Sequence, residues 1–168
     1  MKLGGKLMTS RINVTAMMCE YANESGTQIN NVFDTIKLGE DNKASFYIVM
    51  NVNTINYELN NFYFTFAIEK INRQNEDNMV TILQTLEIEA VSIDENFVEN
   101  HPEQRILMST IPNSGQSTLV YKVSDKEFPG VGKYELQIYM FDKIGSNGIG
   151  LEQLIKDKIV CTYCFEII

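Results

Sequence analysis

The chain has 168 residues, of which 44% are hydrophobic, and its formal net charge is −8. That length predicts one domain, and no apolar run approaches the roughly 20 residues that a membrane-spanning helix needs. The acidic balance argues against nucleic-acid binding, which requires clustered Lys and Arg. Three cysteines and an N-terminal segment without an apolar core favour a reducing compartment, so we expect a cytoplasmic protein.

Residues 1–10 predict a loose leader, and residues 11–168 a single domain. Both Met1 and Met8 fit a natural start. Apolar residues alternate with polar ones over 12–20, which predicts a first strand. A turn cluster follows at 21–27. Residues 28–38 place apolar side chains at helix-like spacing, but the segment is short, and we interpret it as a strand with a bulge.

The middle of the chain predicts the centre of the core. Residues 45–52 are apolar on both faces, as in a central strand. Phe62, Phe64 and Phe66 then form an aromatic stripe. Burial of these three side chains would contribute about 5 to 9 kcal/mol before entropy, at roughly 1.5 to 3 kcal/mol each. A ligand cleft is the alternative role of this stripe. The polar turn at 72–78 predicts a long hairpin over 61–91.

Residues 92–103 form a polar segment that contains Asp94, Glu95 and Glu99. Carboxylate-rich loops at the end of a sandwich can bind Ca²⁺, although the ligand spacing of an EF-hand is absent. A solvated acidic loop is the competing interpretation. His101, the only histidine, lies in the same segment, where a solvated side chain is the ordinary interpretation.

Residues 104–111 predict a further strand, and residues 117–142 predict two strands separated by a Pro-Gly break. These two strands either pair directly or lie in different sheets. Tyr134 opens the second strand, where a tyrosine in immunoglobulin-like sandwiches can fix the preceding loop through its hydroxyl. An ordinary half-buried strand tyrosine is the alternative.

The C-terminal part predicts a short helical turn at 151–157 and a last strand at 158–168. In that strand Ile159, Cys161, Tyr163, Phe165 and Ile167 would share one face. Cys161 and Cys164 match C-x-x-C, but a spacing of three in a strand puts the thiols on opposite faces. We therefore expect Cys161 at the core and Cys164 either outside or against a second layer, with plain apolar packing rather than a metal or redox role.

Taken together, eight or nine strands separated by turns predict an all-β fold. We expect an antiparallel two-sheet sandwich, immunoglobulin-like or jelly-roll-like, with at most one short helix. A small barrel is the alternative architecture.

Two segments resemble a group of small bacterial β-sandwich proteins of unknown function. They are Ala16-Met-Met-Cys-Glu-Tyr-Ala22 and the late Pro129-Gly-Val-Gly-Lys-Tyr-Glu-Leu-Gln-Ile138. The resemblance spans about residues 12–168 and implies a fold, but no catalytic residues. Residues 131–133, between Gly130 and Tyr134, make this spacing longer than that group usually has.

These observations predict a non-catalytic protein-interaction or assembly module, bacterial or phage defence-related, without a cofactor. We expect a protein partner, or self-association through edge strands, because such strands offer unpaired N–H and C=O groups. We expect no nucleic-acid or membrane partner. The alternative is a small-ligand or carbohydrate-binding sandwich, assisted by Ca²⁺. A hydrolase or redox protein that uses His101, or Cys161 and Cys164, is the third hypothesis.

Overall fold

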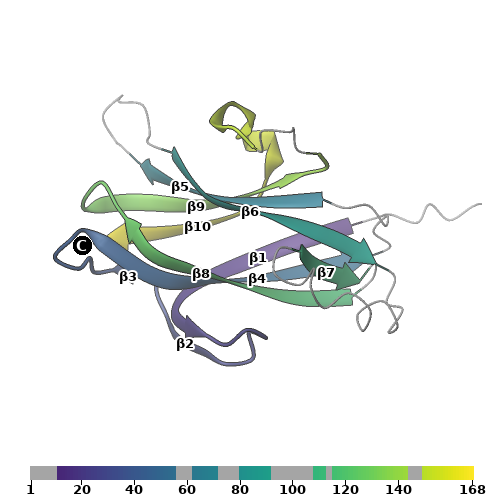
Figure 1. The fold of residues 1–168 in the computed structure, drawn as a ribbon, viewed down its shortest axis with the longest axis horizontal. Helices are drawn as coiled ribbons and strands as arrows, with labels where there is room; N and C mark the ends of the chain where they lie inside the picture. Colours follow the sequence, from purple (N-terminus) through teal and green to yellow (C-terminus); the bar gives the residue numbers. More distant parts are fainter. Residues whose placement is uncertain (1–10, 56–61, 72–79, 92–107, 113–114, 144–148) are drawn as a thin grey trace, which may run out of the picture.

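The computed structural model describes residues 11–55, 62–71, 80–91, 108–112, 115–143 and 149–168 (Figure 1). Ten strands and two single-turn 3-10 helices occur in these ranges. In chain order they are β1 (Arg11–Ala22), β2 (Ile29–Val32), β3 (Thr35–Ile36), β4 (Lys43–Ile55), β5 (Phe62–Ile71), β6 (Val80–Val91), β7 (Met108–Pro112), β8 (Gly115–Glu127), β9 (Gly132–Phe141), η2 (Leu151–Gln153), η3 (Lys156–Lys158) and β10 (Ile159–Ile167).

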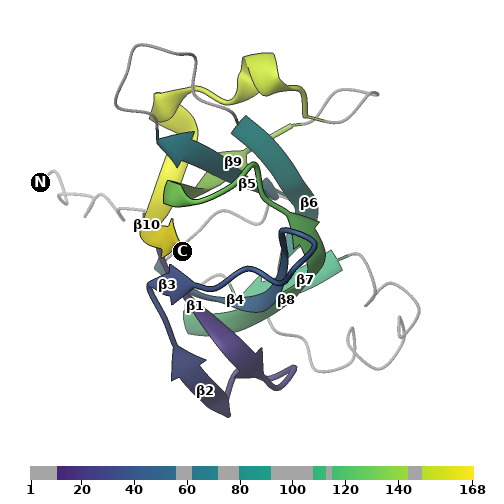
Figure 2. The same cartoon turned by 90° about the vertical axis from the view of Figure 1, so that its left-hand side faces the viewer.

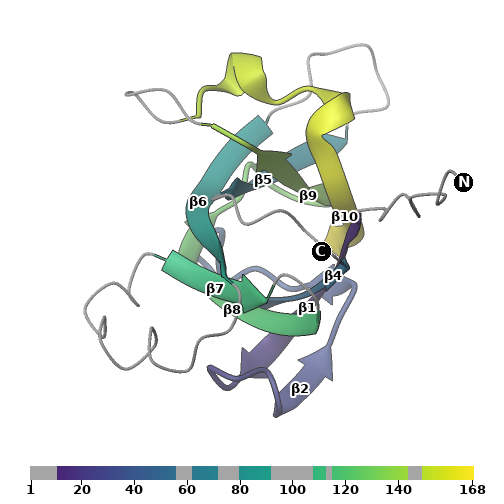
Figure 3. The same ribbon diagram turned by 90° about the vertical axis from the view of Figure 1, so that its right-hand side faces the viewer.

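The strands form two sheets that pack face to face (Figures 2 and 3). The four-stranded sheet has the order β2-β1-β4-β8, and the six-stranded sheet has the order β3-β10-β9-β5-β6-β7. The two-sheet sandwich predicted from the sequence is therefore confirmed. Two pairings at sheet edges, β10 with β3 and β6 with β7, are parallel. No helix in the described ranges is long and apolar enough to cross a membrane.

The single bulged strand expected at 28–38 is wrong, because this segment crosses from one sheet to the other. β2 pairs with β1 in the four-stranded sheet, and β3 pairs with β10 in the six-stranded sheet. Asn31, with φ at 52°, interrupts the extended path. Between the two strands, the Phe33 N–H donates to the Met18 carbonyl oxygen at 3.1 Å. The helix-like spacing arises because Ile29 packs on the outer side of the sandwich, whereas Phe33 packs against the inner core.

The two strands expected within 117–142 lie in different sheets. β8 is an edge strand of the four-stranded sheet, while β9 lies between β10 and β5 in the other sheet. The connection between them carries Phe128, which is buried in the core with only 3% of its surface exposed. Of the two alternatives left by the sequence, the structure therefore has the crossing between sheets.

The core lies between the facing sides of the two sheets. Phe62, Phe64 and Phe66 of β5 point into it, with 1%, 0% and 1% of their surfaces exposed. β4 is central in its sheet and contributes Phe46, Ile48, Met50 and Val52 to the same core.

The prediction that Ile159 shares one face of the last strand with Cys161 and the later alternate residues is wrong. A register irregularity in β10 between Ile159 and Cys161 shifts the alternation by one position. Ile159 therefore packs with Tyr139 and Phe141 on the outer side of the six-stranded sheet. Cys161 and the later residues of the predicted face pack against the inner core. Residues 149–158 run along that same outer side (Figures 2 and 3).

Candidate functional site

The first two strands build a feature that projects from the sandwich. β1 pairs with β4 only as far as Cys19, which faces Tyr47. Beyond that point β1 continues with β2 as a hairpin, residues 19–32, on the side of the four-stranded sheet away from the core (Figures 2 and 3). The tip of this hairpin reaches β8, because a Cβ atom added to Gly26 would lie 2.4 Å from Cγ2 of Thr118.

The hairpin buries an apolar cluster against the outer face of the four-stranded sheet. Cys19, Ala22 and Val49 are 0%, 4% and 0% exposed, and Ile29 and Val120 pack against them. This second small core fixes the hairpin to the sheet by burial of apolar surface. Burial raises the pKa of the Cys19 thiol, and a backbone hydrogen bond at Tyr21 partly opposes that shift. The Cys19 thiol also donates to the Tyr21 carbonyl oxygen at 3.3 Å.

Hydrogen bonds within the loop hold the hairpin tip in one conformation. The Asn23 side chain donates to the Thr27 hydroxyl at 2.9 Å and accepts from the Gln28 N–H at 3.0 Å. The Gly26 N–H donates to the Asn23 carbonyl oxygen at 2.9 Å, and Gly26 has φ at 66°, a value that favours glycine. Both polar ends of the Asn23 side chain are thus engaged in holding the loop.

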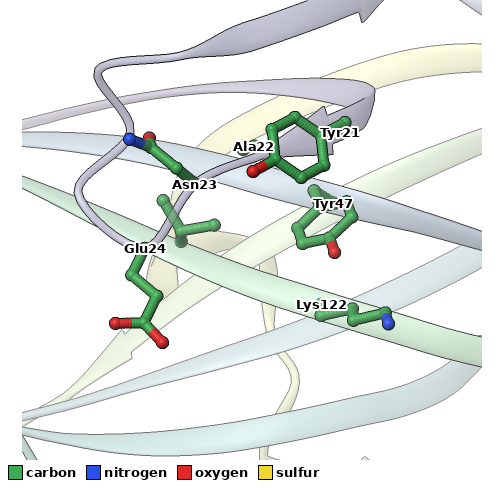
Figure 4. Close-up of a pocket in the computed structure, with 7 residues that line it drawn as sticks. Tyr21, Ala22, Asn23, Glu24, Tyr47 and Lys122 are labelled. Carbon is green, nitrogen blue, oxygen red and sulfur yellow. The ribbon is translucent and has the colours of Figure 1, made fainter.

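A cleft of about 490 Å³ lies between the hairpin and strands β4 and β8 (Figure 4). We call it the hairpin cleft; its lining is Tyr21, Ala22, Asn23, Glu24, Tyr47, Val120 and Lys122. Tyr21 is 44% exposed, and its ring meets that of Tyr47 edge to face, with centroids 5.9 Å apart. The Lys122 Nζ lies 5.8 Å from the centroid of the Tyr47 ring, which places an ammonium group over an aromatic face.

Two opposite charges border the hairpin cleft. Glu24 and Lys122 are both exposed, and neither forms an ion pair with another residue in the described part of the chain. The cleft therefore combines phenol rings, one carboxylate and one ammonium group. This set can bind and orient a small ligand, and its described lining includes no thiol or imidazole that could serve as a nucleophile or base.

A second polar cluster lies on the outer face of the six-stranded sheet. Glu69 and Glu135 face each other across β5 and β9, an arrangement in which like charges repel. The Gln137 side-chain amide lies between them and donates to both carboxylates, at 2.5 Å and 2.8 Å. Gln137 also accepts a hydrogen bond from the Tyr139 hydroxyl. Burial, and then the two carboxylates, raise the pKa of Tyr139. We assign this cluster a structural role.

The three cysteines do not converge. Cys161 packs against the core and Cys164 is exposed, with its Sγ 3.7 Å from a Glu135 carboxylate oxygen. Burial raises the pKa of both thiols, and Glu135 adds to the shift at Cys164. Within the described residues, no three His, Cys, Asp or Glu side chains are grouped so that they could hold a metal ion.

Tyr134 fixes the loop before its own strand. Its hydroxyl donates to the Gly130 carbonyl oxygen at 2.6 Å, and its ring is 1% exposed. The Lys70 ammonium group lies over that ring and donates to the Pro129 carbonyl oxygen at 3.1 Å. Asp94, Glu95, Glu99 and His101 lie outside the described residues, so the calcium site stays a prediction.

One edge of the four-stranded sheet is a long strand. β8 has 13 residues and pairs with β4 on one side. No other strand in the described residues pairs with its opposite side. From Gly115 to Val123 its register with β4 is regular.

The hairpin cleft could not be predicted from the sequence. Tyr21 belonged to a predicted turn and Tyr47 to a predicted central strand, and Lys122 comes from a third segment. Only the pairing of Cys19 with Tyr47, and of Tyr47 with Lys122, brings these side chains to one place.

No family model and no curated protein matches the chain. Solved structures show distant similarity. A β-glucosidase from Listeria innocua is 5% identical with a TM-score of 0.47, over 98% of this chain and 17% of that one. A DNA-bound alkylpurine DNA glycosylase from Pseudomonas fluorescens is 8% identical with a TM-score of 0.43, over 94% of this chain and 30% of that one. A CARDB domain from Pyrococcus furiosus, in complex with di-metal ions, is 10% identical with a TM-score of 0.42, and 97% of each chain is covered.

Proposed function

We propose that the chain is a non-catalytic protein-interaction or assembly module, in which a protein partner or a second copy adds a strand to β8. The observation that carries this proposal is the edge position of this 13-residue strand. An edge strand presents unpaired N–H and C=O groups, and an extended segment of a partner can pair with them.

The part of β8 between Gln116 and Tyr121 favours such pairing. It contains no proline and no charged residue, and its regular register keeps the edge extended. Features that discourage edge pairing come later in the strand. They are Lys122, Lys126 and an irregularity at Asp125, where φ is 48° and the N–H donates to the Ser45 hydroxyl at 2.9 Å.

The state of the three thiols argues against cysteine-based catalysis. The thiolate is the reactive form of cysteine, and burial raises the pKa of Cys19, Cys161 and Cys164, which favours the neutral thiol.

We extend the proposal to an immunoglobulin-like sandwich, supported by the hydrogen bond from Tyr134 to Gly130. We also propose a cytoplasmic location, which the three free cysteines support. The last part of the proposal is a bacterial or phage defence context. Gene neighbourhood would test that context.

The test of edge pairing uses two adjacent proline substitutions, Gln116→Pro and Ser117→Pro. Successive N–H groups of a strand point to opposite sides, so one substitution removes a group facing β4 and the other a group at the open edge. Thermal unfolding identifies the variant that leaves the sheet intact. That variant should lose self-association, measured by light scattering, or lose the partner cross-linked in the native host. Unchanged association in this variant, or a strictly monomeric protein without a partner, would refute the proposal.

A second candidate function, binding of a small ligand or a carbohydrate, is favoured by the hairpin cleft. This site uses the outer face of the four-stranded sheet rather than the open edge of β8. The calcium-assisted version of this function depends on Asp94, Glu95 and Glu99, and a calcium titration followed by thermal unfolding would test it.

A further inference from the structure

The aromatic part of the hairpin cleft is suited to a ligand with exposed C–H groups. Tyr21 and Tyr47 come from the hairpin and from β4, and their rings meet edge to face with an angle of 64°. Ala22 and Val120 supply apolar wall. Aromatic side chains contribute large contact area with a polar hydroxyl at one end, which fits a ligand that has an apolar ring face and a polar rim.

The charges of the cleft select against charged ligands. The Lys122 ammonium group already lies over the Tyr47 ring, the place where a cationic ligand would gain most. Glu24 on the loop repels an anion, and the net charge of −8 repels it further at long range. Both side chains can still hydrogen-bond to neutral hydroxyl groups, one as a donor and the other as an acceptor.

Beside the cleft, the outer face of the four-stranded sheet carries uncharged polar side chains. Thr15, Asn51 and Thr118 form one cross-strand row, and the Thr118 hydroxyl donates to the Asn51 side chain at 2.8 Å. The next row is Asn13, Asn53 and Gln116. Amide and hydroxyl groups match the hydrogen-bonding capacity of sugar hydroxyls.

The cleft is also formed in advance of binding. The loop that carries Glu24 is held by the hydrogen bonds of Asn23 and by the contact of Gly26 with β8. A wall that is already ordered reduces the entropy lost on binding. A volume of about 490 Å³ lies within the usual range of about 300–1,000 Å³ for small-molecule sites.

We infer that the hairpin cleft is a binding site for a neutral saccharide, whose ring face contacts Tyr21 and Tyr47 and whose hydroxyls bond to Glu24 and Lys122. This inference does not depend on strand addition at β8, because the two sites use different surfaces.

The test is a titration of the ¹⁵N-labelled full chain with millimolar maltose, cellobiose and N,N′-diacetylchitobiose, followed by amide chemical shifts. We expect at least one of these neutral disaccharides to shift the amides of 21–24, 47 and 120–122. Tyr21→Ala should weaken that binding about tenfold, since the loss of one aromatic contact approaches the 1.4 kcal/mol that equals a factor of ten. Val32→Ala, on the same hairpin but outside the cleft and 55% exposed, should leave binding unchanged.

Charged probes test the selectivity. Glucosamine and glucuronate should bind more weakly than the neutral disaccharides. Lys122→Gln should improve binding of glucosamine, because Glu24 then remains as the only charge of the cleft. Glu24→Gln should improve binding of glucuronate for the complementary reason. Both variants keep side chains that can hydrogen-bond to a neutral sugar.

Three results would overturn the inference. They are an absence of shifts at these amides with all three disaccharides, shifts that persist unchanged in Tyr21→Ala, and tighter binding of the zwitterionic dipeptide glycylglycine than of every neutral disaccharide. Each result leaves the proposal for β8 intact, because the proline variants at 116 and 117 report on association alone.

Discussion

Removal of the Tyr134 hydroxyl is the sharpest test of how the sandwich holds the crossing between its sheets. In Tyr134→Phe the ring should keep its place, stacked on Phe165 at 5.6 Å and edge to face with Phe128 at 5.5 Å. What is lost is the 2.6 Å hydrogen bond to the Gly130 carbonyl oxygen. A typical intramolecular hydrogen bond contributes about 0.5–1.5 kcal/mol net.

We take about 1 kcal/mol, the middle of that range, as the expected loss in free energy of unfolding, because Gly130 is half-buried. For a chain of this length, that loss lowers the Tm by roughly 2–4 °C. Urea unfolding and calorimetry would measure both quantities.

The matched control is Tyr21→Phe, since the Tyr21 hydroxyl has no hydrogen bond to any described residue. The control should change the Tm by much less. Equal stability of Tyr134→Phe and the control would refute the reasoning that this hydroxyl fixes the loop before β9. A larger loss, comparable to that of Tyr134→Ala, would show that the ring itself had moved.

Three further predictions concern the core, the hairpin and the response to alkali. Phe64→Ala, at a side chain with 0% exposure, should lower the free energy of unfolding by about 3–5 kcal/mol; a loss below about 1 kcal/mol in urea unfolding would contradict its central place. Gly26→Ala, with φ at 66° and a Cβ 2.4 Å from Thr118, should speed hydrogen exchange in residues 19–32 while β9 keeps its protection, and uniform protection would argue against a packed hairpin. The raised pKa of Tyr139 means that the folded state retains a proton that the unfolded state loses above about pH 10, so stability should hold below that pH and fall above it. Tyr139→Phe should make this alkaline fall shallower, and an identical pH profile would disprove the assignment.

The sequence was sufficient for most of the strands because burial on one face of a sheet imposes a period of two. β1, β5, β8 and β9 show that alternation, whereas β4 is apolar on both faces, and each of the five contains the segment expected for it. The segment at 28–38 could not be predicted, because its apolar residues serve two different clusters and so show no single period. The face of Ile159 was missed since a register irregularity leaves no mark in an alternating sequence.

The hairpin cleft lies beyond any local pattern. Tyr21, Tyr47 and Lys122 line it and belong to three different strands. None of these residues is unusual for a strand or a turn. The role of Tyr134 also had two interpretations. A tyrosine at the start of a strand fits the sequence equally well as a half-buried side chain and as a buried one whose hydroxyl holds the preceding loop.

The amino-acid sequence by itself thus determined the all-β fold class, since alternating apolar residues between turns are buried either by stacking one sheet on another or by closing a sheet on itself. The tertiary structure alone decided which strands became neighbours, that β1 and β2 fold over the outer face, and that two tyrosines meet a lysine and a glutamate there. The physical reason is range: alternation is a property of adjacent residues, whereas a cleft is formed by side chains that only the pairing of distant strands brings together.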